Sequence, residues 1–496
     1  MPDKPNILLI LTDQHRLSAM GCYGHTPCQT PHLDRLAREG IRFETAYTSC
    51  PVCSPARASI MTGLYPHQHG ICSNVHDLGS SVHELPDTPR LLSRILQRSG
   101  YRCGYTGKWH LGTDSDVAFG GLNKSSLPRD VGFEGQNFPG HGGGGFKYPE
   151  YREYLSSHGF SHDVQRVDNL SYAAECDGIK FGTLSGPVES TVPHFLTSNT
   201  INLIDAFRET DDPFFIWHNF WGPHQPFYAP KEFYEIYRNI NIPEWPNFQW
   251  ENAESNAPYQ VKLHPRRHEL VWDDWAEAVR HYYAFMTLID LQIGRIIDHL
   301  KETGLIDNTM IIFTADHGET IGSHGGLTDK GWQNFEEIQR IPFVVRPPDA
   351  WSDSERGNVR EDWVSLLDVY PTLLDLGSDS REISTTPGMS LLPLIRGERV
   401  KWRDSVFVEF NGVNSLSTSM VTVRRENIKY GWNCSSWDEL YDLKRDPFEM
   451  HNVARDPSYS EELRAMRSLL NTWMEETRYP GRRMYYQSRI ANTGNP

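Results

Sequence analysis

The chain has 496 residues, which is too long for one small hydrophobic core and predicts a large domain joined to a smaller one. Its 38% hydrophobic and 12% aromatic content is ordinary for a globular protein and excludes a disordered chain. The formal net charge of −16 argues against a general affinity for nucleic acid or anionic membranes, so a bound anion would need a local group of cations.

The first apolar run, Ile7 to Leu11, predicts a buried strand that ends at Asp13. The run is too short for a signal peptide, and no segment approaches the length of a membrane span. The 8 cysteines are irregularly spaced. Without a secretion signal, this cysteine usage indicates reduced thiols, and we expect a cytoplasmic protein.

Helix and strand signals then alternate along the chain. A Ser or Thr cap, a proline at the first helical position and a glycine past the last turn predict helices over 30–40 and 88–100. Each predicted helix is followed by a predicted strand, over 41–47 and 101–106 respectively.

The same alternation returns later, with a buried strand over 214–220, a long amphipathic helix over 273–303 and a strand over 310–318. It predicts an α/β fold with a large, mostly parallel sheet sandwiched by helices. Residues 113–196 are glycine-rich and poorly periodic, so we expect them to form loops beside a site.

The texture of the sequence changes near residue 396. Short strands are predicted over 405–410, 419–425 and 427–432, and a terminal helix over 461–476. We therefore expect a catalytic domain over 1–395 and a smaller C-terminal α+β domain with an antiparallel sheet over 396–496.

The stretch CSPARASIMTG at 53–63 has the signals of a short helix. Ser54 is a good N-cap, Pro55 suits the first helical position and Gly63 follows the last turn. Cys53 would then lie just before a helix N-terminus, where negative charge is favoured, and Arg57 could project toward the same point. A cysteine in such a place is typically acidic and exposed.

Several kinds of cysteine chemistry are compatible with a reactive thiol. The spacing between Cys53 and Arg57 is shorter than in a tyrosine-phosphatase loop, and the sequence context of a thiol protease is absent. A buried cysteine with a purely structural role remains the alternative.

The run Cys53-Ser54-Pro55-Ala56-Arg57, followed by Thr62-Gly63, resembles the C-x-P-x-R signature of type I sulfatases in the alkaline phosphatase superfamily. The resemblance extends over nearly the whole chain, to ELYDLKRDPFEMHNVA at 439–454. It implies an alkaline phosphatase-like fold and a maturation enzyme that oxidises Cys53 to formylglycine. One hydroxyl of the hydrated aldehyde would attack sulfur, and the other would then lose its proton as sulfate leaves.

The resemblance also implies a metal site that includes Cys53. LTDQ supplies Asp13 and Gln14, and FTADHG supplies Asp316 and His317, at positions that usually hold calcium in the family. Carboxylate and amide oxygens suit a hard cation. Gln14 replaces a frequent Asp and His317 a frequent Asn, so Mg²⁺ and Mn²⁺ remain alternatives. In the competing interpretation, Asp316 caps a helix and His317 is a packed loop residue.

Four further residues have roles implied by the resemblance. Lys108 in GYTGKWHLG would bind the sulfate oxygens, and His110 would contact the formylglycine and help to remove its proton. His224 in FWGPHQPF and Lys330 in TDKGW would lie beside the leaving-group oxygen and bind substrate. Taken alone, Lys108 and Lys330 would be interpreted as surface lysines.

Other motifs allow two interpretations each. His67 and His69 in YPHQHG could contact substrate, as we predict for His69, or stabilise their own loop. HGGGG at 141–145 is interpreted as a flexible loop. Four tryptophans could stack on sugar rings or belong to a core or lid; they are Trp217, Trp221, Trp245 and Trp250.

Hydrolysis of a sulfate ester is the leading functional hypothesis, with a sulfated sugar or a small aryl or alkyl sulfate as substrate. A phosphonate monoester or phosphodiester hydrolase is the runner-up, because relatives with the same signature catalyse those reactions. Lys108 and His110 favour sulfate. A binding protein without activity is disfavoured because every motif residue is present. Assembly into a homo-oligomer is left open.

Overall fold

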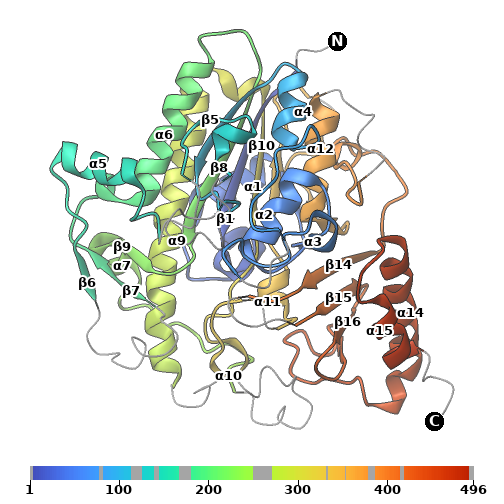
Figure 1. Cartoon of the computed structure of the whole chain (residues 1–496). Coiled ribbons are helices and arrows are strands. Elements are labelled where there is room, and N and C mark those ends of the chain that lie inside the picture. Colours follow the sequence, from blue (N-terminus) through green and yellow to red (C-terminus); the bar gives the residue numbers. More distant parts are fainter. Residues whose placement is uncertain are drawn as a thin grey trace.

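The computed structural model describes residues 4–77, 82–112, 126–138, 144–166, 180–249, 271–330, 333–351, 354–377, 386–413 and 418–490. Its central feature is an eight-stranded sheet with the order β12-β2-β11-β10-β1-β8-β4-β5 (Figure 1). Neighbouring strands run parallel, except that β11 is antiparallel to both β10 and β2. The predicted mostly parallel sheet is confirmed. In sheet order, the strands are β12 (Val359–Arg360), β2 (Ile41–Phe43), β11 (Phe343–Arg346), β10 (Thr309–Ala315), β1 (Asn6–Asp13), β8 (Phe214–Pro223), β4 (Arg102–Gly107) and β5 (Glu134–Gly135).

Strand β1 is buried along its whole length because helices cover both faces of the sheet. Side chains alternate along a strand. Leu9 and Leu11 accordingly belong to one hydrophobic core, whereas Leu8 and Ile10 belong to the core on the opposite face. The continuous apolar run in the sequence is therefore explained by a strand that is buried on both sides.

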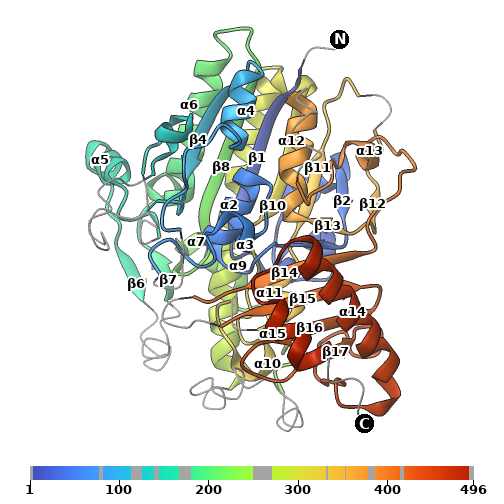
Figure 2. The ribbon, with the colours of Figure 1, turned by 45° about the vertical axis from the view of Figure 1, so that its right-hand side comes forward.

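Each face of the sheet has its own helical layer (Figure 2). The 31-residue helix α9 (Trp272–Glu302) dominates one layer, which also contains α1 (Pro31–Glu39), α6 (Val192–Phe207) and α7 (Lys231–Tyr237). The other layer contains α2 (Cys53–Thr62), α4 (Leu92–Arg98), α12 (Val369–Gly377) and α13 (Leu392–Ile395).

The C-terminal part forms a separate antiparallel sheet, as predicted, with the order β14-β15-β16-β17. Helix α14 (Ser460–Glu476) packs on it through Leu470 and Trp473. The strands are β14 (Ser405–Phe410), β15 (Met420–Arg425), β16 (Ile428–Asn433) and β17 (Glu439–Asp442). Smaller elements complete the described fold: β3 (Ala46–Tyr47) with β13 (Val364–Ser365), the sheet of β6 (Val164–Arg166), β7 (Phe181–Leu184) and β9 (Phe227–Pro230), and the helices α3 (Pro66–His69), α5 (Pro149–His158), α10 (Ser323–Gly326), α11 (Glu336–Gln339) and α15 (Arg482–Tyr485).

Polar contacts join this C-terminal sheet to the segment that leads into α11. Asn334 Nδ2 donates to Glu439 Oε1 at 2.9 Å, and Asn334 Oδ1 accepts from Thr422 Oγ1 at 2.9 Å. Lys429 Nζ pairs with Glu336 Oε1 at 3.1 Å. These groups are buried or half-buried, and buried polar atoms need hydrogen-bond partners. The C-terminal sheet and the segment before α11 supply these partners to each other.

The predicted elements differ from the structure in several places; for example, the strand expected over 310–318 ends at Ala315, and the strand expected over 214–220 continues to Pro223. The strand expected over 41–47 divides into β2 and β3, which belong to different sheets. The helix expected from residue 88 begins at Leu92, after a turn. Residues 113–196 include α5 and the start of α6. Helix α5 has proline at its first position and Gly159 at its end with φ of 64°, so the signals used elsewhere were present there too.

Seven of the cysteines lie in the described residues, and all seven are free thiols, as expected from their spacing. Across the same residues, none of the helices combines the length and the apolar character that a membrane crossing requires.

Candidate active site

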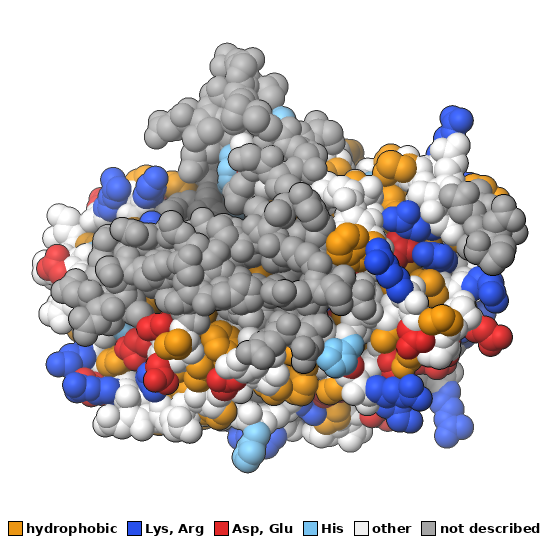
Figure 3. Space-filling view, turned by 90° about the horizontal axis from the view of Figure 1, so that it is seen from below, with side chains coloured by type: hydrophobic (Ala, Val, Ile, Leu, Met, Phe, Trp, Pro, Cys, Tyr) orange, Lys and Arg blue, Asp and Glu red, His pale blue; other side chains and the backbone are white. Residues whose placement is uncertain are grey.

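The site begins where β1 and β10 end side by side. These strands pair in parallel, with Thr12 opposite Ala315, so the residues that follow each strand meet at one edge of the sheet. Gln14 N donates to Asp316 Oδ1 at 3.0 Å. Figure 3 looks toward this end of the molecule, where acidic and basic side chains are interspersed around the rim.

Helix α2 brings Cys53 to this edge as its first residue. The Sγ atom lies 3.4 Å from His317 Nε2, 3.5 Å from Lys108 Nζ and 3.9 Å from Asp13 Oδ1. The expectation of an exposed thiol is wrong, because Cys53 is only 1% exposed. Ser54 is not the N-cap either: Val52 precedes the helix, and the Ser54 hydroxyl donates to the His110 carbonyl at 2.6 Å.

The guanidinium of Arg57, one turn further along α2, joins both carboxylates. Its Nη2 lies 2.9 Å from Asp13 Oδ2 and 3.2 Å from Asp316 Oδ2. Its Nη1 donates to Asn219 Oδ1 and to the Lys108 carbonyl, both at 2.8 Å. All the side chains of this ion-pair group are fully buried. Arg57 therefore fixes the carboxylates relative to the helix that carries Cys53.

Four side chains have the chemistry and spacing of a metal site: ligand atoms of Asp13, Cys53, Asp316 and His317 all lie within 4.8 Å of one another. His317 Nδ1 donates to the Gly318 carbonyl at 3.0 Å, and burial lowers the pKa of His317, so the neutral ring keeps a lone pair on Nε2. Burial and the nearby Asp13 raise the pKa of Asp316 to about 7. A cation between the carboxylates would offset both the burial of Asp316 and its repulsion from Asp13. This set of donor atoms therefore fits a divalent ion.

Gln14 lies beside these four residues and contacts Lys330. Its Oε1 accepts from Lys330 Nζ at 2.6 Å, and its backbone has φ of 62°. Lys330 is 5% exposed, and Asp329 lies 3.4 Å from its Nζ. Burial disfavours the charged ammonium, but Asp329, Cys53 and Asp13 outweigh burial and raise the pKa of Lys330.

Lys108 is held between Asp13 and an aromatic wall. Its Nζ lies 2.6 Å from Asp13 Oδ2 and 4.9 Å from the centroid of Trp221, and the residue is fully buried. Neither Lys108 nor Lys330 is a surface lysine, so that interpretation of the isolated motifs is wrong.

His224 contacts the same tryptophan. Its backbone N–H donates to the Asp13 carbonyl at 3.0 Å, and its ring meets Trp221 edge-on at 4.6 Å. Burial, Lys330 and Lys108 hold the pKa of His224 well below its usual value. Nδ1 donates to the Gln225 carbonyl at 2.8 Å, which leaves Nε2 of a neutral ring as an acceptor.

The remaining predicted histidines lie in different surroundings. His110 adopts φ of 54° and places Nε2 at 3.3 Å from His76 Nδ1. Both ring nitrogens of His69 have partners: Ser59 Oγ of α2 lies 3.3 Å from Nε2, and the Ile71 N–H donates to Nδ1 at 3.1 Å. The substrate-binding role of His69 stays a prediction. His67 contacts the C-terminal sheet.

The tryptophans divide between core and site. Trp217 packs in the core against Tyr105, and Trp221 borders the site as described. The ring of Trp245 stacks under Arg16, whose guanidinium carbon is 4.5 Å from the ring centroid. Trp250 and the glycines at 142–143 lie outside the described residues.

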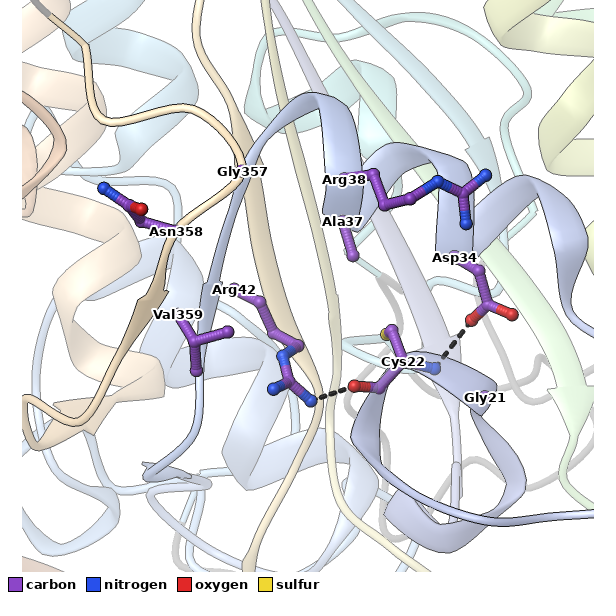
Figure 4. Close-up of a pocket in the computed structure, with 9 residues that line it drawn as sticks. All are labelled: Gly21, Cys22, Asp34, Ala37, Arg38, Arg42, Gly357, Asn358 and Val359. Carbon is purple, nitrogen blue, oxygen red and sulfur yellow. Dashed lines mark hydrogen bonds between the residues drawn. The ribbon is translucent and has the colours of Figure 1, made fainter.

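A separate pocket of about 340 Å³ lies between α1, β2 and the residues before β12 (Figure 4). The Cys22 N–H donates to Asp34 at 2.7 Å, and Arg42 donates to the Cys22 carbonyl. Burial and Asp34 raise the pKa of Cys22 to about 12, so its thiol is unreactive. Asp34 and Arg42 are already hydrogen-bonded to the backbone of Cys22, so we assign no function to this pocket.

Two residues of the site were missed in the sequence. Asn219 lies on β8 and bonds Arg57, and Glu319 accepts a hydrogen bond from Gln14. The position of Glu319, close to the Asp316-His317 motif, could have indicated a role in the site. For Asn219, the only indication in the sequence is a polar residue inside an apolar strand.

Comparison with known proteins decides the family. The family model described as "Sulfatase" matches residues 5–379, and the model described as "N-sulphoglucosamine sulphohydrolase, C-terminal" matches residues 322–476. The chain belongs to the sulfatase family. The resemblance and the expectation of a sulfuric ester hydrolase are thereby confirmed.

Relatives in this family cover almost the whole chain. The uncharacterized sulfatase YidJ of Escherichia coli is 30% identical over 97% of this chain and 89% of its own. The N-acetylglucosamine-6-O-sulfatase of Bacteroides thetaiotaomicron is 28% identical over 94% of this chain and 86% of its own. The crystal structure of the phosphonate monoester hydrolase of Agrobacterium radiobacter has a TM-score of 0.77 at 25% identity, and it covers 95% of this chain and 96% of its own.

Proposed function

We propose that this sulfatase hydrolyses small sulfate esters, with a terminal sulfated sugar as the favoured substrate class. The observation that carries the proposal is the buried group of Cys53, Arg57 and Lys108 around the carboxylates of Asp13 and Asp316. Cations held in a dry, preorganised site stabilise an anionic ester far better than the same groups in water. The net charge of −16 disfavours a long polyanionic substrate in comparison with a small one.

Each residue has a part in the proposal. Formylglycine at position 53, made by a maturation enzyme, would supply the hydroxyl nucleophile, and a divalent cation (calcium first) at Asp13, Asp316 and His317 would polarise the sulfate oxygens. Lys108 is placed to bind a sulfate oxygen. Arg57 bonds both carboxylates and keeps them aligned.

The leaving-group side is formed by His224 and Lys330. The charged ammonium of Lys330 would stabilise developing negative charge on the ester oxygen. We assign proton donation to Lys330 and not to His224, because the ring of His224 is neutral. We assign His110 to removal of the proton from the formylglycine hydrate; its backbone carbonyl accepts a hydrogen bond from Ser54, the residue next to Cys53.

A phosphonate monoester hydrolase remains the second candidate, because the structure with the TM-score of 0.77 has that printed activity. A phosphonate replaces one non-bridging oxygen with a carbon group, which needs space where Lys108 lies against Trp221. We therefore expect sulfate to be preferred.

The deciding experiment is co-expression with a formylglycine-generating enzyme. Peptide mass spectrometry would quantify formylglycine at position 53, and kcat/KM would be compared for 4-nitrophenyl sulfate and 4-nitrophenyl phenylphosphonate. A higher value for the sulfate supports the proposal, and Cys53→Ala is the matched inactive control. A preference for the phosphonate, or full turnover with an unmodified thiol, would overturn it.

A further inference from the structure

The carboxylate of Glu319 accepts a hydrogen bond from the side-chain amide of Gln14, whose oxygen accepts one from Lys330. Glu319 is 3% exposed. Gln14 Nε2 donates to its Oε2, and the backbone N–H groups of Ile321 and Asp329 donate to its Oε1 at 2.9 Å and 2.7 Å. Thr320 Oγ1 also donates to Oε1, at 3.4 Å. Every one of these contacts brings a donor to the carboxylate.

This arrangement fixes the orientation of the Gln14 amide. An ionised carboxylate only accepts hydrogen bonds, so the amide nitrogen must face Glu319 and the amide oxygen must face the other way. That oxygen is where Lys330 Nζ donates, at 2.6 Å. The Asp329 N–H bond fixes the residue next to Lys330, so one carboxylate positions both partners of the Gln14–Lys330 contact.

The same arrangement accounts for the location of the negative charge. The backbone N–H of Gln14 donates to Asp316 Oδ1, its side chain presents a neutral oxygen to Lys330, and the negative charge lies next to its amide nitrogen, on Glu319. A carboxylate at position 14 would instead lie against Glu319 without a donor between them, and like charges in a buried place are costly.

We propose that Glu319 is a positioning residue that orients the Gln14 amide oxygen toward the cation site and Lys330, and that Gln14 and Glu319 act as one matched donor–acceptor pair. The inference rests on the proposed metal site and on the proposed role of Lys330. It predicts that the two side chains can be exchanged together but not singly.

The test compares wild type, Gln14→Glu, Glu319→Gln and the double exchange Gln14→Glu/Glu319→Gln. In the double variant the net charge is unchanged, and an amide at 319 can again donate to a carboxylate at 14. Affinity for Ca²⁺ and Mn²⁺ would be measured by calorimetry on chelator-stripped protein, together with Tm and kcat/KM. Glu277→Gln is the control, because Glu277 is a half-buried glutamate on α9 whose carboxylate is bonded to Tyr234 and Arg280.

Each single variant should lose about 10-fold or more in metal affinity, the usual cost of disturbing the partner of a ligand. The double exchange should recover to within about threefold of wild type, because paired residues are not additive. Glu277→Gln should leave metal affinity unchanged.

Three results would overturn the inference: a Glu319→Gln protein with wild-type metal affinity and kcat/KM, a double exchange no better than the weaker single variant, or a wild type that binds no divalent ion. If one single variant does not fold, recovery of folding by the double exchange supports the pair, and failure of both contradicts it. A wild type that binds metal but cleaves no sulfate ester would refute the proposed function. The metal affinity and Tm of the variants would still test the Gln14–Glu319 pair.

Discussion

His67 Nδ1 lies 2.5 Å from Glu409 Oε1, and His67 Nε2 lies 2.9 Å from the Thr477 carbonyl oxygen. With an acceptor at each ring nitrogen, the imidazole must donate twice, which only the protonated ring can do. His67 lies on α3, shortly after the helix of Cys53, whereas Glu409 lies on β14. A charged hydrogen bond therefore joins the active-site side of the molecule to the C-terminal sheet.

This contact predicts a pH dependence of stability. Burial lowers the pKa of His67, but Glu409 and the Thr477 carbonyl outweigh burial and raise it above 6.5. Because the folded pKa is raised, the stabilisation is complete below the unfolded value and is lost as pH rises through the folded value. The Tm of wild type should therefore fall between about pH 6 and pH 8, relative to the Tm of Glu409→Gln, which keeps a hydrogen-bond acceptor but not the charge. At the lower pH, the substitution should lower the free energy of unfolding by about 1.5–3 kcal/mol. Parallel Tm curves of the two proteins would contradict this prediction.

Arg57→Lys should be strongly destabilising although the charge is kept. An ammonium cannot reach Asp13, Asp316 and Asn219 together, whereas the planar guanidinium does. Leaving a buried carboxylate without its partner costs about 3–5 kcal/mol. Denaturant unfolding measures this loss, and the exposed ion-pair variant Arg94→Lys serves as the control. Equal losses in both variants would argue against a special role for Arg57.

Lys108→Ala should lower kcat/KM for an aryl sulfate by about 100-fold or more, the usual loss of one preorganised charge-stabilising group. The loss for the matching phenylphosphonate should be smaller, because removal of the side chain also opens space for the carbon substituent. Steady-state kinetics with both substrates measures the ratio. An equal loss on both substrates would mean that Lys108 does not discriminate between them.

Removal of metal should abolish turnover and lower Tm. Asp13 and Asp316 lie close together beside the neutral imidazole of His317, so an ion that binds the folded state stabilises it by mass action, by about 2.7 kcal/mol at one hundred times its Kd. Dialysis against a chelator, elemental analysis and titration with Ca²⁺, Mg²⁺ and Mn²⁺ would measure both effects. A stripped protein that keeps its rate and Tm would refute the metal site.

The sequence allowed the parts of the fold that depend on local pattern to be predicted. The apolar run of β1 and the long helix α9 have strong periodic signals, and their boundaries agree with the structure to within one residue at most positions. The strand over 41–47 was divided because tertiary pairing with β13 takes over at Ala46. No local propensity announces such a change of partner.

The candidate site was predicted from motifs, and its geometry shows what motifs omit. Asp13 and Asp316 could be paired in advance because parallel strands place their carboxyl ends together. The prediction that Ser54 caps the helix was wrong, because its hydroxyl donates to the His110 carbonyl, a partner distant in sequence. Asn219 and Glu319 were missed for the same reason: each matters through a residue that only the folded chain brings near.

The polar contacts between Asn334 and the strands of the C-terminal sheet have a consequence for the construction of chimeric sulfatases. Asn334 follows Lys330 closely, and its amide is held from both sides by Glu439 and Thr422. A chimera that takes its last hundred or so residues from a relative would alter the contacts near Lys330, the lysine that we propose binds substrate. Such hybrids should therefore differ in turnover as well as in solubility, unless Asn334, Thr422 and Glu439 are transferred as a matched set.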